Sequence, residues 1–205
     1  MLVYNFRRDV LIMSKIQKII YDNKGYITFG QIKETNTSYS VIKKMLENGE
    51  IEKEKPGLYR LPEIYIDEYY VLQHRYPRGV YSLETALWLH GLSLTIPHEP
   101  IMSFPYGTNT KLIKQAGIRP IIMRSNYEEG ITDVTTSGGQ QVKAYEIERT
   151  LVECLRPLYK IDVQIISYAF KSYAKKSKIN YSKLFKYAKM FKVEAKVQSY
   201  LEVLE

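Results

Sequence analysis

Hydroxyl and ammonium side chains gather in one short segment of the N-terminal part of the sequence: Thr37, Ser38, Tyr39, Ser40, Lys43 and Lys44. Hydroxyl groups can hydrogen-bond to base edges, and lysines can neutralise phosphates, which together is the chemistry of duplex DNA recognition. Lys53 and Lys55 follow a few residues later and would add phosphate contacts. These eight residues form a candidate DNA-binding site.

The apolar spacing around this site predicts the elements that must position it. One helix begins near Ser14, and Thr28 is a suitable cap for a second. A third helix is predicted by an apolar stripe at Val41, Ile42, Met45 and Leu46. Residues 51–61 then favour two short strands around a Pro-Gly turn. This order predicts a winged helix-turn-helix domain over residues 13–62, whose third helix would enter the major groove.

Two other interpretations of the N-terminal segment stay open. A winged helix can serve protein contacts alone, and a small helical bundle can be followed by a chance hairpin. Neither alternative requires the lysines to contact phosphates. DNA binding is therefore the property that distinguishes the DNA-binding interpretation from both alternatives.

The remainder, residues 63–205, is expected to form a larger mixed domain. The tyrosine-rich stretch after Pro62 favours a connection, and a helix is predicted from Ser82 to His90. Four β-prone runs follow, at residues 100–104, 118–124, 131–135 and 141–145. A helix at residues 146–155 and wholly helical chain from about 161 complete an α+β protein with a lysine-rich helical end.

The net charge of +8 is concentrated towards the ends of the chain. Residues 13–61 carry nine basic and six acidic residues, residues 62–155 carry eight and eleven, and residues 156–205 carry eleven and four. Two basic ends suit a protein that holds a polyanion at two places. The second basic surface would comprise Lys171, Lys175 and Lys178, which are expected to share one exposed helix face, together with Lys183, Lys186 and Lys189. A merely solvated lysine face is the alternative.

Three other functional classes compete with DNA binding as explanations of the sequence. A metal nuclease would need converging carboxylates, for which Asp133, Glu146 and Glu148 are the candidates, with Lys143 beside them. However, Glu146, Glu148 and Glu153 fall where a helix is predicted to start, and acids there are favoured by the helix dipole alone. Trp88 and the many tyrosines could stack on RNA bases, but such residues more often fill cores. Three scattered histidines and the single Cys154 match no metal or triad spacing. We therefore expect no enzyme activity, no metal and no cofactor.

No stretch of the sequence approaches the roughly 20 apolar residues that a membrane-spanning helix needs. Residues 1–12 lack the long apolar core and cleavage site of a signal peptide, and we treat them as a leader or upstream extension without function. A cytoplasmic location without membrane contact is expected.

Three segments carry a resemblance to a known family. They are GLYRLP at residues 57–62, VYSLETALWLHGLS at residues 80–93, and VKAYEIERTLVECL at residues 142–155. In this order they resemble the AbiEi antitoxins of bacterial abortive-infection systems. The matches span most of residues 14–160 and concern the fold, not individual catalytic residues.

The resemblance implies a type IV toxin-antitoxin role in antiviral defence. The antitoxin would oppose a nucleotidyltransferase toxin without a stable complex, and it would repress its own operon at inverted repeats in the promoter. The winged helix would be needed for repression, and the C-terminal part would carry the antitoxin activity and add basic surface to operator DNA. We expect a monomer in solution that pairs cooperatively on DNA. The alternative is a winged helix fused to a nuclease-like or RNA-binding domain.

Overall fold

The computed structural model describes residues 15–176 and 178–202. The chain packs as two compact units. The first unit runs up to Arg75 and includes the turn Thr136–Gln140, and the second comprises Tyr76–Thr135 and the chain from Gln141 onward. Helices and two sheets make a mixed α+β protein, as the sequence predicts. The expected leader, residues 1–12, lies outside the described residues.

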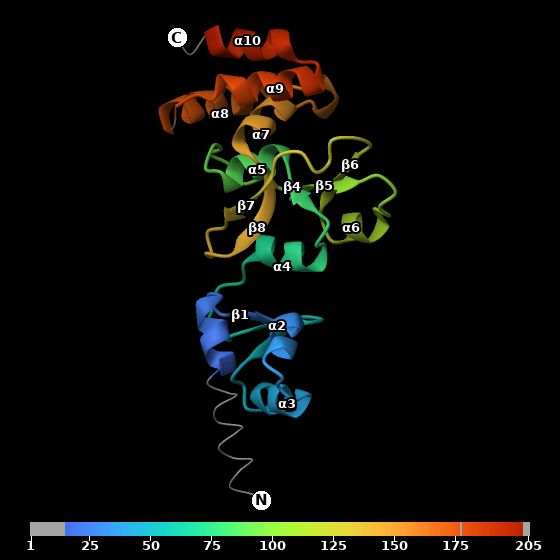
Figure 1. Cartoon of the computed structure of the whole chain (residues 1–205), viewed down its shortest axis with the longest axis vertical. Coiled ribbons are helices and arrows are strands. Elements are labelled where there is room, and N and C mark those ends of the chain that lie inside the picture. The colour runs from blue at the N-terminus through green and yellow to red at the C-terminus, as the bar shows by residue number, and fades with distance from the viewer. Residues whose placement is uncertain (1–14, 177, 203–205) are drawn as a thin grey trace, which may run out of the picture. The chain divides into compact units, whose positions relative to one another are not determined.

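The first unit combines short helices with a three-stranded sheet (Figure 1). Its elements are a helix at residues 15–22, β1 (Tyr26–Thr28), α2 (Phe29–Glu34), α3 (Tyr39–Glu47), β2 (Glu52–Lys55), β3 (Leu58–Arg60) and α4 (Glu68–Arg75). The sheet order is β1-β3-β2, and both pairings are antiparallel. The predicted apolar stripe of α3 joins the core, which includes Ile16, Ile20, Ile27, Ile32, Ile42, Met45 and Ile51.

The turn between β2 and β3 follows from its two residues. Proline suits the first central position of a type II turn, and the second requires a positive φ that glycine adopts without strain. Gly57, which follows Pro56, has a φ of 77°. The register of β2 on β3 shifts between Lys53 and Lys55, as at a β-bulge. The hairpin therefore projects a locally twisted strand that carries both lysines.

The start of α2 offers a direct test of this local structure. The Thr28 hydroxyl accepts a hydrogen bond from the backbone N–H of Gln31 at 3.2 Å, and the Gln31 side chain accepts one from the Thr28 N–H at 2.9 Å. Because such a capping box satisfies two backbone donors, Thr28→Ala is expected to lower the free energy of unfolding by about 1 kcal/mol in urea. Thr110→Ala is the control, since Thr110 precedes α6 (Lys111–Gln115) without a side-chain cap. Equal losses in both variants would contradict the capping role.

The segment after Pro62, predicted to be a connection, instead contains α4. The Asp67 carboxylate accepts a hydrogen bond from the Tyr70 N–H at 3.1 Å, and the Asp67 N–H donates to the Tyr26 hydroxyl at 2.8 Å. The rings of Tyr26 and Tyr70 pack edge to face, with centroids 5.0 Å apart. The expected boundary at Pro62 and the observed division at Arg75 differ because these contacts join α4 to the first unit.

The second unit is built on a five-stranded mixed sheet. Its strands are β4 (Val80–Tyr81), β5 (Ile101–Pro105), β6 (Arg119–Met123), β7 (Ile131–Thr135) and β8 (Gln141–Tyr145), in the order β6-β5-β4-β8-β7. The pairs β4–β8 and β5–β6 are parallel, and the other two are antiparallel. All four predicted runs are strands, whereas the two-residue β4 and the single-turn α6 were too short to predict.

Helices pack around one central helix in this unit. They are α5 (Leu83–Leu89), α7 (Ile147–Cys154), α8 (Val163–Lys176), α9 (Tyr181–Phe191) and α10 (Glu194–Glu202), with a short 3-10 helix η1 (Pro157–Tyr159). In Figure 1, α7 contacts α5, α8 and α9, and α10 lies against α9. The core includes Leu87, Leu151, Val152, Phe170, Leu184 and Val197, together with the buried Cys154. Within residues 15–176 and 178–202, no helix is long and apolar enough to cross a membrane.

Candidate nucleic-acid interface

Helix α3 has one buried and one exposed side. Val41, Ile42 and Met45 are buried, whereas the side facing away from the core exposes Ser40, Lys43, Lys44 and Glu47. This division follows from the spacing of the apolar residues, because positions three and four apart share a helix face. The exposed side is therefore polar and contains two of the predicted phosphate contacts.

The hydroxyl groups at the start of α3 are partly engaged with one another. The Ser38 hydroxyl accepts a hydrogen bond from the Ser40 N–H at 3.3 Å and lies 2.8 Å from the Ser40 hydroxyl. Thr37 contacts the Thr35 hydroxyl and is half-buried. Tyr39 is 61% exposed. Ser38, Tyr39 and Ser40 thus lie at the accessible helix N-terminus, whereas Thr37 is turned towards its own loop.

The acidic side chains of β2 pair with an arginine of the same hairpin. Arg60 lies 2.6 Å from the Glu52 carboxylate and 3.0 Å from that of Glu54. Lys53 and Lys55, on the same strand, are exposed and have no ion-pair partner among the described residues. Because Arg60 holds both carboxylates, Lys53 and Lys55 stay outside these ion pairs, and three basic against two acidic side chains leave the hairpin with a net positive charge of one.

The lysines of α3 differ in their surroundings. Lys43 lies 3.6 Å from Glu47 one turn later, and both side chains are more than half exposed. Lys44 has no ion-pair partner in the described part of the chain. Exposed pairs of this kind contribute little energy, so the Lys43 ammonium can exchange its partner for a phosphate.

The predicted second basic surface is divided by the structure. Lys183 lies 2.5 Å from Glu146, and Lys186 lies 3.2 Å from Glu129. The hydrogen bond to Glu146 raises the pKa of Lys183. Both ammonium groups are already matched by a carboxylate from elsewhere in the second unit. The six lysines therefore do not form one uniformly free basic face.

The prediction that Lys171, Lys175 and Lys178 share one helix face is wrong for Lys178. Helix α8 ends at Lys176, so Lys178 belongs to the following irregular segment. Lys171 and Lys175 lie one turn apart and are exposed, as is Lys189 on α9. Four exposed lysines of the predicted set form no ion pair with another described residue: Lys171, Lys175, Lys178 and Lys189.

Two of the candidate nuclease carboxylates, Glu146 and Glu148, are engaged in other contacts. The Glu146 carboxylate accepts hydrogen bonds from Lys183 and from the Tyr187 hydroxyl, each at 2.5 Å, and Glu148 accepts one from Tyr173 at 2.7 Å. The bonds to Lys183 and Tyr187 outweigh desolvation and lower the pKa of Glu146. Among the described residues, no group of three or more His, Cys, Asp or Glu is placed to hold a metal ion. The described residues therefore offer no set of metal ligands that would support the nuclease alternative.

The aromatic side chains that could stack on RNA bases lie partly in the core and partly on the surface. Tyr26, Tyr81, Tyr145 and Tyr187 are buried, and Trp88 is half-buried. The most exposed rings, Tyr21, Tyr65 and Tyr106, are spread over both units. The aromatic content therefore serves largely to fill the two cores.

A buried charge cluster in α7 was not predicted from the sequence. Arg149 and Glu153 are 0% and 1% exposed and lie 3.6 Å apart, and Arg156 lies 3.6 Å from the same carboxylate. The dipole explanation offered for acids near a helix start is wrong for Glu153, which is close to the C-terminal end of α7. Burial raises its pKa, and the two guanidinium groups oppose that rise. The i, i+4 spacing of Arg149 and Glu153 was the available signal.

Comparison with known proteins shows that this chain resembles a solved structure in its fold. No protein-family model and no curated protein matches the sequence. Among solved structures, the crystal structure of the RV2827C protein from Mycobacterium tuberculosis is similar, with a TM-score of 0.57 and 12% sequence identity over 94% of this chain and 76% of that one. At this identity, the likeness shows that the mixed helical and sheet architecture is shared.

Proposed function

We propose that the first unit is a winged helix-turn-helix domain that binds duplex DNA. The order of helix, β1, α2, α3, β2 and β3, with β1 added to the β2–β3 hairpin, supports this assignment. In such domains the third helix enters the major groove and the hairpin forms the wing. The exposed lysines of α3 and of the hairpin would then contact phosphates, and Tyr39 and Ser40 would face base edges.

We further propose that the chain is the antitoxin and autorepressor of a type IV toxin-antitoxin operon. This part of the proposal rests on the resemblance to AbiEi antitoxins. Of the three segments that carry the resemblance, residues 80–93 contain β4 with α5, and residues 142–155 contain α7 and most of β8. The first unit would bind inverted repeats in the promoter, with additional contacts from exposed lysines of the second. The second unit would counter a nucleotidyltransferase toxin, and the protein would act in the cytoplasm without enzymatic activity.

The observation that carries the DNA-binding proposal is the set of exposed lysines on α3 and the hairpin: Lys43, Lys44, Lys53 and Lys55. The test is binding of the full chain to the DNA immediately upstream of its own gene, compared with a shuffled fragment of equal length. We expect a preference for the upstream fragment that weakens as salt increases, because counterions are released on binding. Equal affinity for both fragments at every salt concentration would contradict autorepression.

Base recognition at the start of α3 can be separated from phosphate contact. A good base contact contributes roughly 1 to 3 kcal/mol of discrimination, so Ser40→Ala is expected to relax the preference at particular base pairs. The measurement is affinity for a panel of operator fragments with single base-pair changes. Gln17→Ala, at an exposed position on the helix at residues 15–22, is the control. A uniform loss across the panel would assign Ser40 to positioning only.

A further inference from the structure

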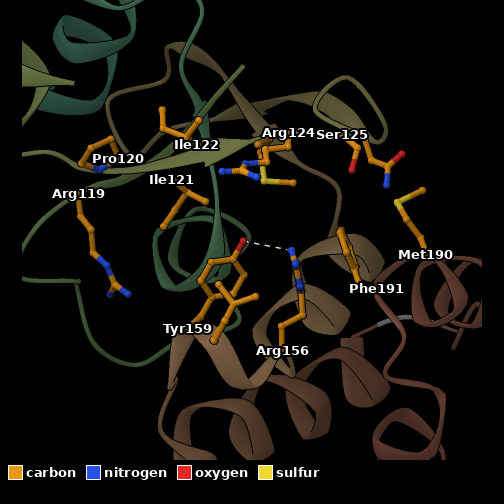
Figure 2. A pocket seen from close by; sticks show the side chains of 13 residues that line it. Arg119, Pro120, Ile121, Ile122, Arg124, Ser125, Arg156, Tyr159, Met190 and Phe191 are labelled. Carbon is orange, nitrogen blue, oxygen red and sulfur yellow. Dashed lines mark hydrogen bonds between the residues drawn. The ribbon is translucent and has the colours of Figure 1, made fainter. Parts of the chain in front are cut away.

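An open cleft of about 620 Å³ lies in the second unit and was not part of the predicted basic surface. It is bordered by β6 and the residues after it, by η1 and by the end of α9. Its charged lining residues are Arg119, Arg124 and Arg156, and none of the described residues that line it is acidic. Arg119 opens β6 and Arg124 directly follows it, whereas Arg156 directly precedes η1, and Figure 2 shows the three side chains.

The aromatic wall of the cleft is organised around Arg156. Its guanidinium lies 4.9 Å from the ring centroid of Phe191 and 5.2 Å from that of Tyr159, and it donates a hydrogen bond to the Tyr159 hydroxyl at 3.2 Å. In Figure 2 the Arg156 side chain stands between these two rings. Planar guanidinium groups held in this way are well suited to paired hydrogen bonds with phosphate oxygens.

Positive charge behind this wall exceeds the negative charge that balances it. Arg149 and Arg156 both lie 3.6 Å from Glu153, so two guanidinium groups share one carboxylate. Arg149 is fully buried, lies 5.5 Å from the Phe191 ring, and donates to the backbone carbonyl of Asn126 at 2.7 Å. Its Nη2 atom has no hydrogen-bond partner. Arg149 and Glu153 are buried, whereas the Arg156 side chain is 24% exposed, so the excess positive charge lies at the cleft surface and favours an anion there.

The two outer arginines remain available to a ligand. Arg119 is 42% exposed and its one ion-pair contact, to Glu84, is long at 3.9 Å. Arg124 is exposed and lies 5.9 Å from the Tyr106 ring, without an ion-pair partner among the described residues. Between them, Ile121, Met190 and Phe191 give the cleft an apolar part. Cationic and apolar surface thus meet in a space of the size that small-molecule sites use.

We propose that this cleft binds a nucleoside phosphate. The arginines bind the phosphate oxygens, and the apolar part covers the base or sugar. The ligand is either a free nucleotide or the phosphorylated terminal nucleotide of a strand, because both present the same group. The inference concerns the second unit alone and does not depend on DNA binding by α3.

The test is titration of the full chain with a fluorescent ATP analogue, followed by competition. We expect saturable binding below about 1 mM, displaced by ATP. A 5′-phosphorylated pentanucleotide and its unphosphorylated counterpart distinguish the two possible ligands. Competition by the phosphorylated strand assigns the cleft to a strand end. Competition by ATP alone assigns it to a free nucleotide. Arg119→Gln and Arg124→Gln should each weaken binding about tenfold or more, because each removes a charge-assisted contact.

Matched variants keep this test specific. Lys114→Gln removes an exposed charge of the same unit outside the cleft and should leave the affinity unchanged. Lys44→Ala should also leave it unchanged, so that failure of the DNA-binding proposal is distinguishable from failure of this one. Thermal melting establishes that Arg119→Gln and Arg124→Gln fold normally. Absence of saturation below about 5 mM, or equal affinity of both arginine variants and the unaltered chain, would overturn the proposal.

Discussion

Replacing Glu153 with leucine is expected to lower the free energy of unfolding by about 3 to 5 kcal/mol, the cost of leaving a buried charge without its partner. Glu153 is 1% exposed and balances both Arg149 and Arg156. The guanidinium charge of Arg149 would remain buried beside Phe191. This loss is a large fraction of the 5 to 15 kcal/mol by which most domains are stable.

The measurement is urea denaturation of the full chain, followed by a signal from the second unit. Glu128→Leu is the matched control, because Glu128 is exposed and the same substitution there should change stability by no more than about 0.5 kcal/mol. Arg149→Met combined with Glu153→Leu tests the cause. If the buried charge is responsible, the double variant should be more stable than Glu153→Leu alone. A double variant that is less stable would assign the loss to packing or to the backbone contacts of Arg149.

Those backbone contacts explain why Arg149 is retained in the core at all. Its Nη1 atom donates to the carbonyl oxygens of Asn126 and Glu129, in the loop between β6 and β7. Its guanidinium lies 3.4 Å from the Tyr145 ring at the end of β8. One side chain thereby ties α7 to a loop and to the sheet. The loop also borders the arginine cleft, so the same residue connects core stability with the shape of that cleft.

Local chemistry explains which parts of the fold the sequence predicts well. Thr28 caps α2 where its hydroxyl and the following Gln31 favour a helix start, and Pro56-Gly57 makes the expected turn. The alternating runs that became β7 and β8 match their predicted bounds, residues 131–135 and 141–145. In each case, residues within a few positions of one another determine the backbone conformation.

The features that were missed depend on residues far apart in the chain. Helix α4 lacks a strong apolar stripe and is held by contacts between Tyr26 and the segment at Asp67–Tyr70. In the sequence, no acidic residue lies near Lys183 and Lys186. In the folded chain, Glu146 pairs with Lys183 and Glu129 pairs with Lys186. Charge counted along a sequence therefore overstates the basic surface wherever tertiary pairing supplies a carboxylate.

A second large effect is expected for the combined variant Lys43→Ala, Lys44→Ala, Lys53→Ala and Lys55→Ala. If each lysine neutralises one phosphate, the slope of log affinity against log salt should decrease by about 3 to 4 units, and affinity at roughly 0.1 M salt should fall by about a thousandfold. These four side chains are exposed, so folding should be unaffected. The measurement is DNA binding across a salt series, with a fixed upstream fragment.

The control for this variant removes four charges from the second unit, through Lys171→Ala, Lys175→Ala, Lys178→Ala and Lys189→Ala. Both variants have the same net charge, so a difference between them cannot arise from long-range attraction alone. We expect the control to reduce the slope by about 1 to 2 units, since these lysines would only supplement the winged helix. Equal reductions would place the second unit on DNA as firmly as the first, whereas an unchanged slope in the α3 and hairpin variant would remove that face from the interface.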